Sequence, residues 1–488
     1  MFDNSQDITT SNTFLTSFCH PSSAGVIGTP GSDPLLGLTP QHELALSSGL
    51  DDAYINAHRQ KLESTVSSSN EVLGEASSHL FLFSQANSLD AIASNTTTTS
   101  TNLTKTVAQD GTLSDPLTGL TGDTPLVNSL NQSTGQPPQI RDFRLRSAVN
   151  NYFQDGELDR NDMMAIFQNA EDGGVINGRE LRDLQAILNS ASYFNMDDYV
   201  EVLSNKVVNG NQANLTSGIG NLARGSSSAQ MEQLVDKWFL GTDHPDAEGY
   251  TYQFASGSLF QNGISYQDVD QGAVGDCYFL AGLAATALQA PTTIQDMFID
   301  NGDNTFTVRF YNSEGEADYV TVDSYLPTTT SGTFVYANMG DSSANSSNEL
   351  WVALAEKAYA QLNESGWINQ DNTNSYQGIA GGYISDALEH ITRMNASLGN
   401  SLDFNAVVNA FNSGESIGFC SRNTTASNVV PNHAYVLVDY NASTQMFTLF
   451  NPWGVDGGYY QGSLRPGIIE LNWSQIQASF IYWDHTTA

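Results

Sequence analysis

Basic residues are scarce in this chain of 488 residues, in which 17 lysines and arginines stand against 53 aspartates and glutamates. The formal net charge of −36 repels the phosphates of nucleic acids and the headgroups of anionic lipids, so neither is expected as a partner. The same charge attracts divalent cations and opposes self-association, but it indicates no particular metal site.

The chain also lacks any apolar run of about 18 residues, so no membrane-spanning helix is expected. Its first residues have neither a basic stretch nor an apolar core, which argues against a secretory signal. The default location is therefore the cytoplasm, and export would need a signal-independent route. Cysteine is rare as well: Cys19, Cys277 and Cys420 are too few for a disulfide framework, and no CxxC pair indicates zinc.

Composition divides the chain into three regions. Residues 1–140 are rich in Ser, Thr, Asn, Gly and Asp, which predicts a low-complexity, flexible tail or prosegment. Residues 141–237 carry apolar residues at three- and four-residue spacing, which predicts a small all-helical module. Residues 238–488 alternate strand-like, helical and glycine-rich segments, which predicts an α+β domain. Residues 225–229 and 241–249 are expected to form the hinges into the last region.

Two stretches of the helical module resemble degenerate EF-hand loops. In residues 169–180 the sixth place is glycine and the twelfth is glutamate, as such a loop requires, but places one, three and five lack a full set of carboxylates. Residues 151–162 repeat the glycine and end on aspartate. The pattern favours an EF-hand-like shape over calcium binding, with a plain helix–turn–helix as the alternative.

Cys277 stands in QGAVGDCYFLAGLAATALQ (271–289), directly before an apolar helical pattern. Gly275 and Asp276 are expected to break and cap the chain there, which places the thiol in the first turn of a helix. The thiolate is the reactive form of cysteine, and both a helix N-terminus and a nearby imidazolium stabilise it. Taken alone, the residue fits either a buried core thiol or a nucleophile.

Three further side chains are candidates to complete a nucleophilic site. His433 opens the strand HAYVLVDY, where its ring can face a cleft. Asn451 follows the next apolar strand, and antiparallel pairing of the two strands would let its amide orient the imidazole. Gln271, six residues before Cys277, is placed to donate an N–H to an oxyanion, an interaction worth about 10²–10³ in rate.

With Gln, Cys, His and Asn in this order, the chain resembles the calpains, the calcium-dependent papain-like cysteine proteases. The resemblance spans about residues 235–485 and rests on QGAVGDCYFLAGLA, VTVDSYLP, ELWVALAEKAYAQLN, GIAGGYISDALEHIT, HAYV and NPWG. It implies a papain-like fold of two lobes, a helical one with Cys277 and a strand-rich one with His433 and Asn451. It implies that Cys277 is the nucleophile, His433 the general base and acid, Asn451 the group that orients His433, and Gln271 an oxyanion donor.

The resemblance also implies calcium as a modulator, with Asp268 and Glu356 matching carboxylate ligands of the first-lobe calcium site. The sequence departs from the calpain pattern in three ways. Tyr278 follows the nucleophile where calpains usually have Trp, and the segment after NPWG lacks the acidic pair of the second-lobe calcium site. The penta-EF-hand and C2-like domains of animal calpains are not recognisable. The chain therefore looks like a bacterial calpain-like peptidase with a helical module of its own.

The expected function is that of a cysteine endopeptidase acting on proteins or peptides, modulated by calcium and cleaving itself within residues 1–250. One alternative is a transglutaminase-type acyltransferase, against which Asn451 argues because that class generally completes its triad with Asp. The other is a non-enzymatic, calcium-responsive binding module with a papain-like shell, against which the complete set of four site residues argues.

Overall fold

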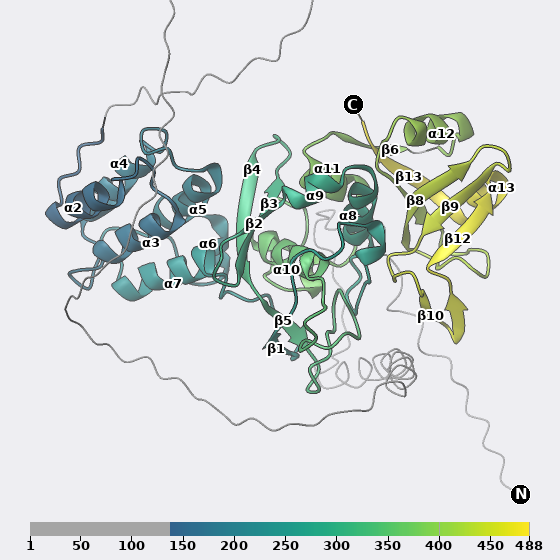
Figure 1. Ribbon diagram of the computed structural model, residues 1–488, viewed down its shortest axis with the longest axis horizontal. Helices are drawn as coiled ribbons and strands as arrows, with labels where there is room; N and C mark the ends of the chain where they lie inside the picture. The colour runs from purple at the N-terminus through teal and green to yellow at the C-terminus, as the bar shows by residue number, and fades with distance from the viewer. Residues whose placement is uncertain (1–136, 400, 488) are drawn as a thin grey trace, which may run out of the picture. The chain divides into compact units, whose positions relative to one another are not determined.

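The structure, a computed structural model, describes residues 137–399 and 401–487 (Figure 1). The low-complexity region expected for residues 1–140 therefore lies outside the described residues apart from its last four, and so does Cys19. Of the two units into which the chain divides, the one formed by residues 65–132 also lies outside. No helix of the described part has the length and apolar character needed to cross a bilayer.

The helical module begins the described part of the chain. Its helices are α2 (Phe143–Tyr152), α3 (Arg160–Asn169), α4 (Gly178–Leu188), α5 (Asp198–Val208), α6 (Gln212–Thr216) and α7 (Ser228–Phe239). All of them except α5 start at an Asp, Asn or Ser whose side chain accepts a backbone N–H of the first turn. Their apolar faces meet in one shared core.

The loops before α3 and α4 keep part of the EF-hand pattern. Their sixth-place glycines, Gly156 and Gly174, have φ of +96° and +74°, a region that glycine enters without strain. The twelfth-place carboxylates, Asp162 and Glu180, accept the backbone N–H of the residue that caps the following helix, at 3.1 and 2.7 Å. These carboxylates therefore serve as helix caps, and the EF-hand likeness of the module stays a prediction.

Antiparallel strands form the second architectural element. A three-stranded sheet has the order β2-β3-β4 and a six-stranded sheet the order β12-β9-β8-β7-β13-β6; β1 pairs with β5 and β10 with β11. The strands are β1 (Thr251–Phe254), β2 (Phe298–Asp300), β3 (Thr305–Tyr311), β4 (Ala317–Asp323), β5 (Tyr325–Thr328), β6 (Ala396–Gly399), β7 (Ile417–Ser421), β8 (Ala434–Asn441), β9 (Met446–Phe450), β10 (Gly458–Tyr460), β11 (Ser463–Arg465), β12 (Ile468–Asn472) and β13 (Phe480–Thr486). With helices on antiparallel sheets, the fold class is α+β, as expected.

The helices that accompany these sheets are α8 (Cys277–Gln289), α9 (Pro291–Gln295), α10 (Trp351–Leu362), α11 (Ile384–Thr392), α12 (Phe404–Asn412) and α13 (Trp473–Ser479), with short 3₁₀ turns η1 (Tyr266–Asp268), η2 (Asn363–Ser365) and η3 (Gln377–Ile379). Helix α8 is the central one, because eleven of its thirteen residues are buried. It packs on α10, α11, β7 and β8. A Cβ at Gly282 would lie 2.9 Å from the Ala387 Cβ, so glycine is needed where α8 crosses α11.

The helical module is joined to the three-stranded sheet through α5, α7 and β4 (Figure 1). The Lys206 ammonium lies 2.5 Å from Asp318 Oδ1, donates to the Tyr319 carbonyl at 2.7 Å and stands 4.1 Å from the centre of the Trp238 ring. The Tyr319 side chain belongs to the apolar core of the module. A buried ammonium is stable only with a carboxylate or hydrogen-bond acceptors beside it. Because β4 provides these groups for Lys206, this strand helps to hold the helical module against the sheet.

Residues 241–249 do not form the expected hinge. Lys237, at the end of α7, forms ion pairs with Asp243 and with a buried glutamate of η2. His244 Nε2 lies 2.8 Å from Asp323 Oδ2 at the end of β4. The segment is therefore tied at several points to the lobe that follows it, and the prediction of a hinge is wrong. Glycine and proline content indicated a flexible link, but tertiary ion pairs override it.

Replacing Asp318 by Ala is expected to destabilise the fold by about 3–5 kcal/mol, because Lys206 is left buried without its carboxylate. Denaturant unfolding followed by circular dichroism measures the change. The matched control is Glu314→Ala in the exposed turn before β4, which should stay within about 0.5 kcal/mol of wild type. Equal effects of the two substitutions would contradict the assignment.

Candidate active site

Cys277 is the first residue of α8 and is fully buried. Asp276 occupies the position before the helix, but its side chain makes no capping bond to the first turn. The capping role predicted for Asp276 is therefore wrong. The helix starts here because an unbroken apolar run follows, and the backbone before it is held by a bond from the Gly381 N–H to the Gly275 carbonyl at 3.0 Å.

His433 and Asn451 lie at neighbouring ends of β8 and β9. These strands pair antiparallel, as the sequence predicted, and bring His433 Nε2 to 2.7 Å from Asn451 Oδ1. The same Oδ1 accepts the Trp453 backbone N–H at 3.1 Å, which fixes the orientation of the amide. Nε2 must then carry the proton of this bond, so Nδ1 is the ring nitrogen that can exchange a proton with a thiol. The centre of the Trp453 ring lies 5.0 Å from the centre of the imidazole.

The His433 backbone is fixed by β7. Its N–H donates to Ser421 Oγ at 2.8 Å and its carbonyl accepts the Ser421 N–H at 2.9 Å. The Ser421 hydroxyl donates in turn to the Val430 carbonyl at 2.6 Å. The imidazole is therefore carried by a rigid backbone on one side and oriented by an amide on the other.

Tyr435 packs beside the imidazole. Its ring centre lies 5.4 Å from that of His433, in an edge-on arrangement. Burial raises the pKa of the Tyr435 hydroxyl, and the charge of a Cys277 thiolate raises it further, which places the sulfur near this side chain. Together with the packing of α8 on β8, this brings Cys277, His433 and Asn451 into one region.

Gln271 is also in this region, but its amide differs from the expectation. Its backbone N–H donates to the Pro452 carbonyl at 2.8 Å and so ties the segment before Cys277 to the segment after Asn451. Its side-chain Nε2 donates to the Val274 carbonyl at 2.9 Å and to Asp276 Oδ1 at 3.2 Å. The sequence predicted a donor directed at an oxyanion, whereas in this structure both N–H groups are engaged within the loop.

Residues 251–479 match the family model of the calpain family cysteine proteases. This part of the chain belongs to the calpain family. The match runs from β1 to the end of α13 and covers the candidate nucleophile, histidine and asparagine. The helical module lies before it.

Curated proteins of this family are similar over the same part of the chain. Calpain clp-4 of Caenorhabditis elegans is 30% identical over 249 residues, which are 46% of this chain and 32% of that protein. The calpain-1 catalytic subunit of Rattus norvegicus is 29% identical over 218 residues, covering 40% and 28%. The calpain-type cysteine protease DEK1 of Zea mays is 32% identical over 163 residues, covering 33% and 7%. The chain thus spans at most about a third of these relatives, and similarity is confined to the calpain-family domain.

The two carboxylates expected to bind calcium have separate partners. Asp268 Oδ2 accepts the Trp351 indole N–H at 3.2 Å, whereas Glu356 is fully buried and accepts the Ala337 N–H at 3.0 Å. The acidic neighbour of Asp268 is Glu349, whose pKa is raised to about 7 by burial and, more weakly, by the Asp268 charge. No cluster of three or more His, Cys, Asp or Glu side chains suited to a metal occurs in residues 137–399 and 401–487. Asp268 and Glu356 therefore have different hydrogen-bond partners, and their role as calcium ligands stays a prediction.

Glu356 instead forms a carboxyl pair that the sequence analysis missed. Burial raises its pKa, and burial together with the Glu356 charge raises that of Asp276, the residue before the nucleophile. The two side chains hydrogen-bond to each other, which requires a proton between them. An acid directly before an apolar helix was interpreted as a cap, so only the tertiary contact reveals the pair.

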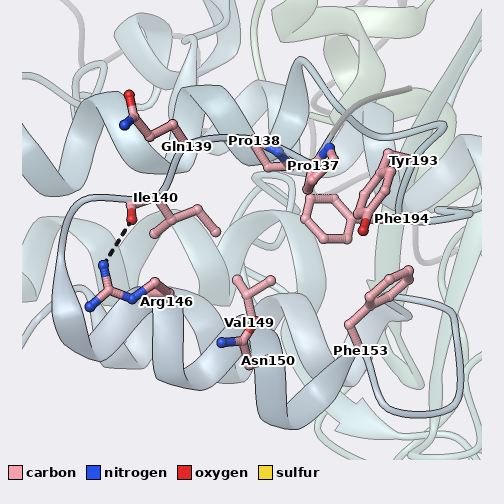
Figure 2. Close-up of a pocket in the computed structure, with 10 residues that line it drawn as sticks. All are labelled: Pro137, Pro138, Gln139, Ile140, Arg146, Val149, Asn150, Phe153, Tyr193 and Phe194. Carbon is pink, nitrogen blue, oxygen red and sulfur yellow. Dashed lines mark hydrogen bonds between the residues drawn. The ribbon is translucent and has the colours of Figure 1, made fainter. Parts of the chain in front are cut away.

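A pocket of about 310 Å³ lies away from this region, in the helical module (Figure 2). Apolar side chains such as Val149, Phe153 and Phe194 line it, and Arg146 reaches across to the Ile140 carbonyl at 3.3 Å. Its lining includes no cysteine, histidine or carboxylate. It therefore offers neither a nucleophile nor a general base.

Glu356→Gln is expected to change how stability depends on pH. A carboxyl whose folded pKa lies above its unfolded value of 4.5 stabilises the fold below that value, and the contribution is lost as pH rises through the folded pKa. The variant should therefore gain stability relative to wild type between about pH 5 and about pH 8. Thermal unfolding at both ends of the range measures it, with exposed Glu314→Gln as control. A difference that shrinks toward high pH would contradict the prediction.

Proposed function

We propose that this chain is a calpain-like cysteine endopeptidase that hydrolyses proteins through Cys277, His433 and Asn451. The observation that carries the proposal is the 2.7 Å bond between His433 Nε2 and Asn451 Oδ1, because it engages Nε2 and leaves Nδ1 as the ring nitrogen for proton transfer. The position of Cys277 at the start of α8 supports it as well, since a helix N-terminus stabilises a thiolate.

In this mechanism His433 Nδ1 takes the thiol proton, and the Cys277 thiolate attacks the carbonyl carbon of the scissile peptide bond. The carbonyl oxygen becomes an oxyanion. When the oxyanion collapses, the C–N bond breaks and the leaving amine takes the proton from His433, which leaves a thioester. His433 then deprotonates water, which attacks the thioester and releases the acid and the thiol. Asn451 keeps the ring in one orientation through both halves of the reaction.

We assign the oxyanion donors to the Cys277 backbone N–H and to one N–H of Gln271. The second assignment requires the Gln271 amide to release one of its two present acceptors. Such a donor is worth about 10²–10³ in rate, so its position bears directly on activity.

We retain calcium modulation as part of the proposal, with Glu349 in place of Glu356 beside Asp268. Both carboxylates are partly buried, and the Asp268 charge raises the pKa of Glu349; they offer the oxygen ligands that calcium prefers, and a bound cation would offset their repulsion. Autoprocessing is proposed only for the chain before residue 140, because the helices that follow share one packed core, which α5 and α7 join to β4.

Purified chain should hydrolyse casein, and Cys277→Ala should abolish the activity. His433→Ala should lower kcat by about 10²–10⁴, because proton transfer then depends on water. Release of acid-soluble peptide measures turnover. Ammonia release without peptide cleavage would instead favour a transglutaminase-type acyltransferase. No cleavage, with Cys277 alkylating no faster than free cysteine, would favour a binding module.

Asp268→Asn and Glu349→Gln should each raise the calcium concentration for half-maximal casein hydrolysis by about tenfold or more, equivalent to about 1.4 kcal/mol of binding. Glu356→Gln is the matched control, because its carboxylate faces Asp276 and Ala337; its calcium midpoint should stay that of wild type. Titration from chelator upward gives the midpoints. A shift caused by Glu356→Gln alone would restore the ligand assignment that the sequence resemblance implied, and hydrolysis unaffected by calcium would remove the metal from the proposal.

A further inference from the structure

The Gln271 side chain has no spare donor in this structure. An amide nitrogen carries two hydrogens, and those of Nε2 go to the Val274 carbonyl at 2.9 Å and to Asp276 Oδ1 at 3.2 Å. Exchanging the amide oxygen and nitrogen would set an oxygen against the Val274 carbonyl, so the orientation is fixed by this contact. The Gln271 Oε1 atom is buried without a partner among the described residues.

Asp276 is placed to hold this amide rather than the helix. Its side chain caps no N–H of α8 although it directly precedes Cys277, and it is fully buried. One of its oxygens accepts from Gln271. Burying a carboxylate is unfavourable unless a donor hydrogen-bonds to it, and the Gln271 amide is such a donor for Asp276. The contact to Gln271, rather than helix capping, therefore accounts for this carboxylate.

Glu356 braces Asp276 from α10. Its Oε2 atom is fixed by the Ala337 N–H at 3.0 Å. In the described part of the chain, Asp276 Oδ2 and Glu356 Oε1 are both buried carboxyl oxygens that no N–H or O–H group of another residue reaches. A single proton shared between the two carboxyls satisfies both atoms and leaves one negative charge beside Cys277 instead of two, consistent with the hydrogen bond between these side chains.

We propose that Asp276, braced by Glu356, is a positioning residue for the oxyanion donor: it holds the Gln271 amide beside Cys277 in a resting position from which one N–H is released to the oxyanion. This inference rests on the proposed protease function for its kinetic consequence, but not for the contact itself. The bond to be released is the one to Asp276, since at 3.2 Å it is longer than the bond to the Val274 carbonyl. Sharing a proton with Glu356 weakens Asp276 as an acceptor and so eases the release.

The position of the Gln271 amide can be measured without any catalysis. In full-length protein labelled with ¹⁵N-glutamine, Gln271→Ala identifies the side-chain amide signal. We expect slow hydrogen exchange of this amide in wild type, fast exchange in Asp276→Ala, and near-wild-type exchange in Asp276→Asn, which keeps an acceptor oxygen. Asp484→Ala removes another fully buried carboxyl, one that accepts the Ser385 N–H, and should leave the signal unchanged. An unchanged signal in Asp276→Ala would overturn the proposal.

The kinetic consequence is tested by a double-mutant cycle on casein or a peptide substrate. Gln271→Ala and Asp276→Ala should each lower kcat by about 10²–10³ with little change in KM, since they affect the transition state. Because Asp276 acts through Gln271, the double variant should be within about twofold of Gln271→Ala alone, the scatter expected of measured effects. If the loss in kcat of the double variant equals the product of the two single losses, the positioning role is overturned. Asp276→Asn should recover most of the kcat lost in Asp276→Ala.

The two readouts separate the two hypotheses. If wild type cleaves no substrate while the amide signal responds to Asp276→Ala as expected, the protease function fails and the positioning of Gln271 stands. If wild type cleaves casein and the Gln271 amide signal is unchanged in Asp276→Ala, the positioning role fails and the protease function stands. Thermal unfolding of each variant shows whether it is folded, and Asp276→Asn remains informative if the alanine variant is not.

Discussion

Burial of α8 on all sides is the constraint on which the rest of this domain depends. A helix that is apolar around its whole circumference cannot lie on a surface, so other elements must enclose it. The Phe279 ring stacks on that of Tyr359 in α10 at 4.0 Å between centres, and α8 also packs on β7, β8 and α11. Enclosure by the strand-rich lobe is what brings the first residue of the helix, Cys277, close to the strand that carries His433.

In the part of the chain that the structure describes, several carboxylates are paired with buried lysines. Lys206, Lys237 and Lys357 are all buried, and each is paired with at least one carboxylate. Burial lowers the pKa of Lys357 to about 8 despite its bond to Asp323, so burial disfavours the charged ammonium even when it is paired with a carboxylate. These pairs join the helical module, β4 and α10, which explains why the module is continuous with the lobe beside it.

The candidate site combines a rigid part and a part that must move. His433 and Asn451 are fixed by strand pairing, by Ser421 and by the Trp453 backbone, so no rearrangement is needed to orient the imidazole. The Gln271 amide, in contrast, is engaged by Asp276, and the oxyanion role proposed for it requires a change of partner. In the proposed mechanism, the groups that transfer protons are therefore positioned independently of the group that stabilises charge.

The sequence by itself determined the α+β class, the helix that begins at Cys277, and the strands before and after which His433 and Asn451 stand, because these follow from local periodicity and turn residues. Tertiary structure alone decided the rest. Asp276 reads as a helix cap and becomes a buried partner of Gln271 and Glu356, since which groups a buried carboxyl meets depends on elements far apart in the chain. Contacts between residues far apart in the chain leave no periodic signal in the sequence. The tertiary partners of residues predicted to be caps, hinges or metal ligands are therefore visible only in the folded structure.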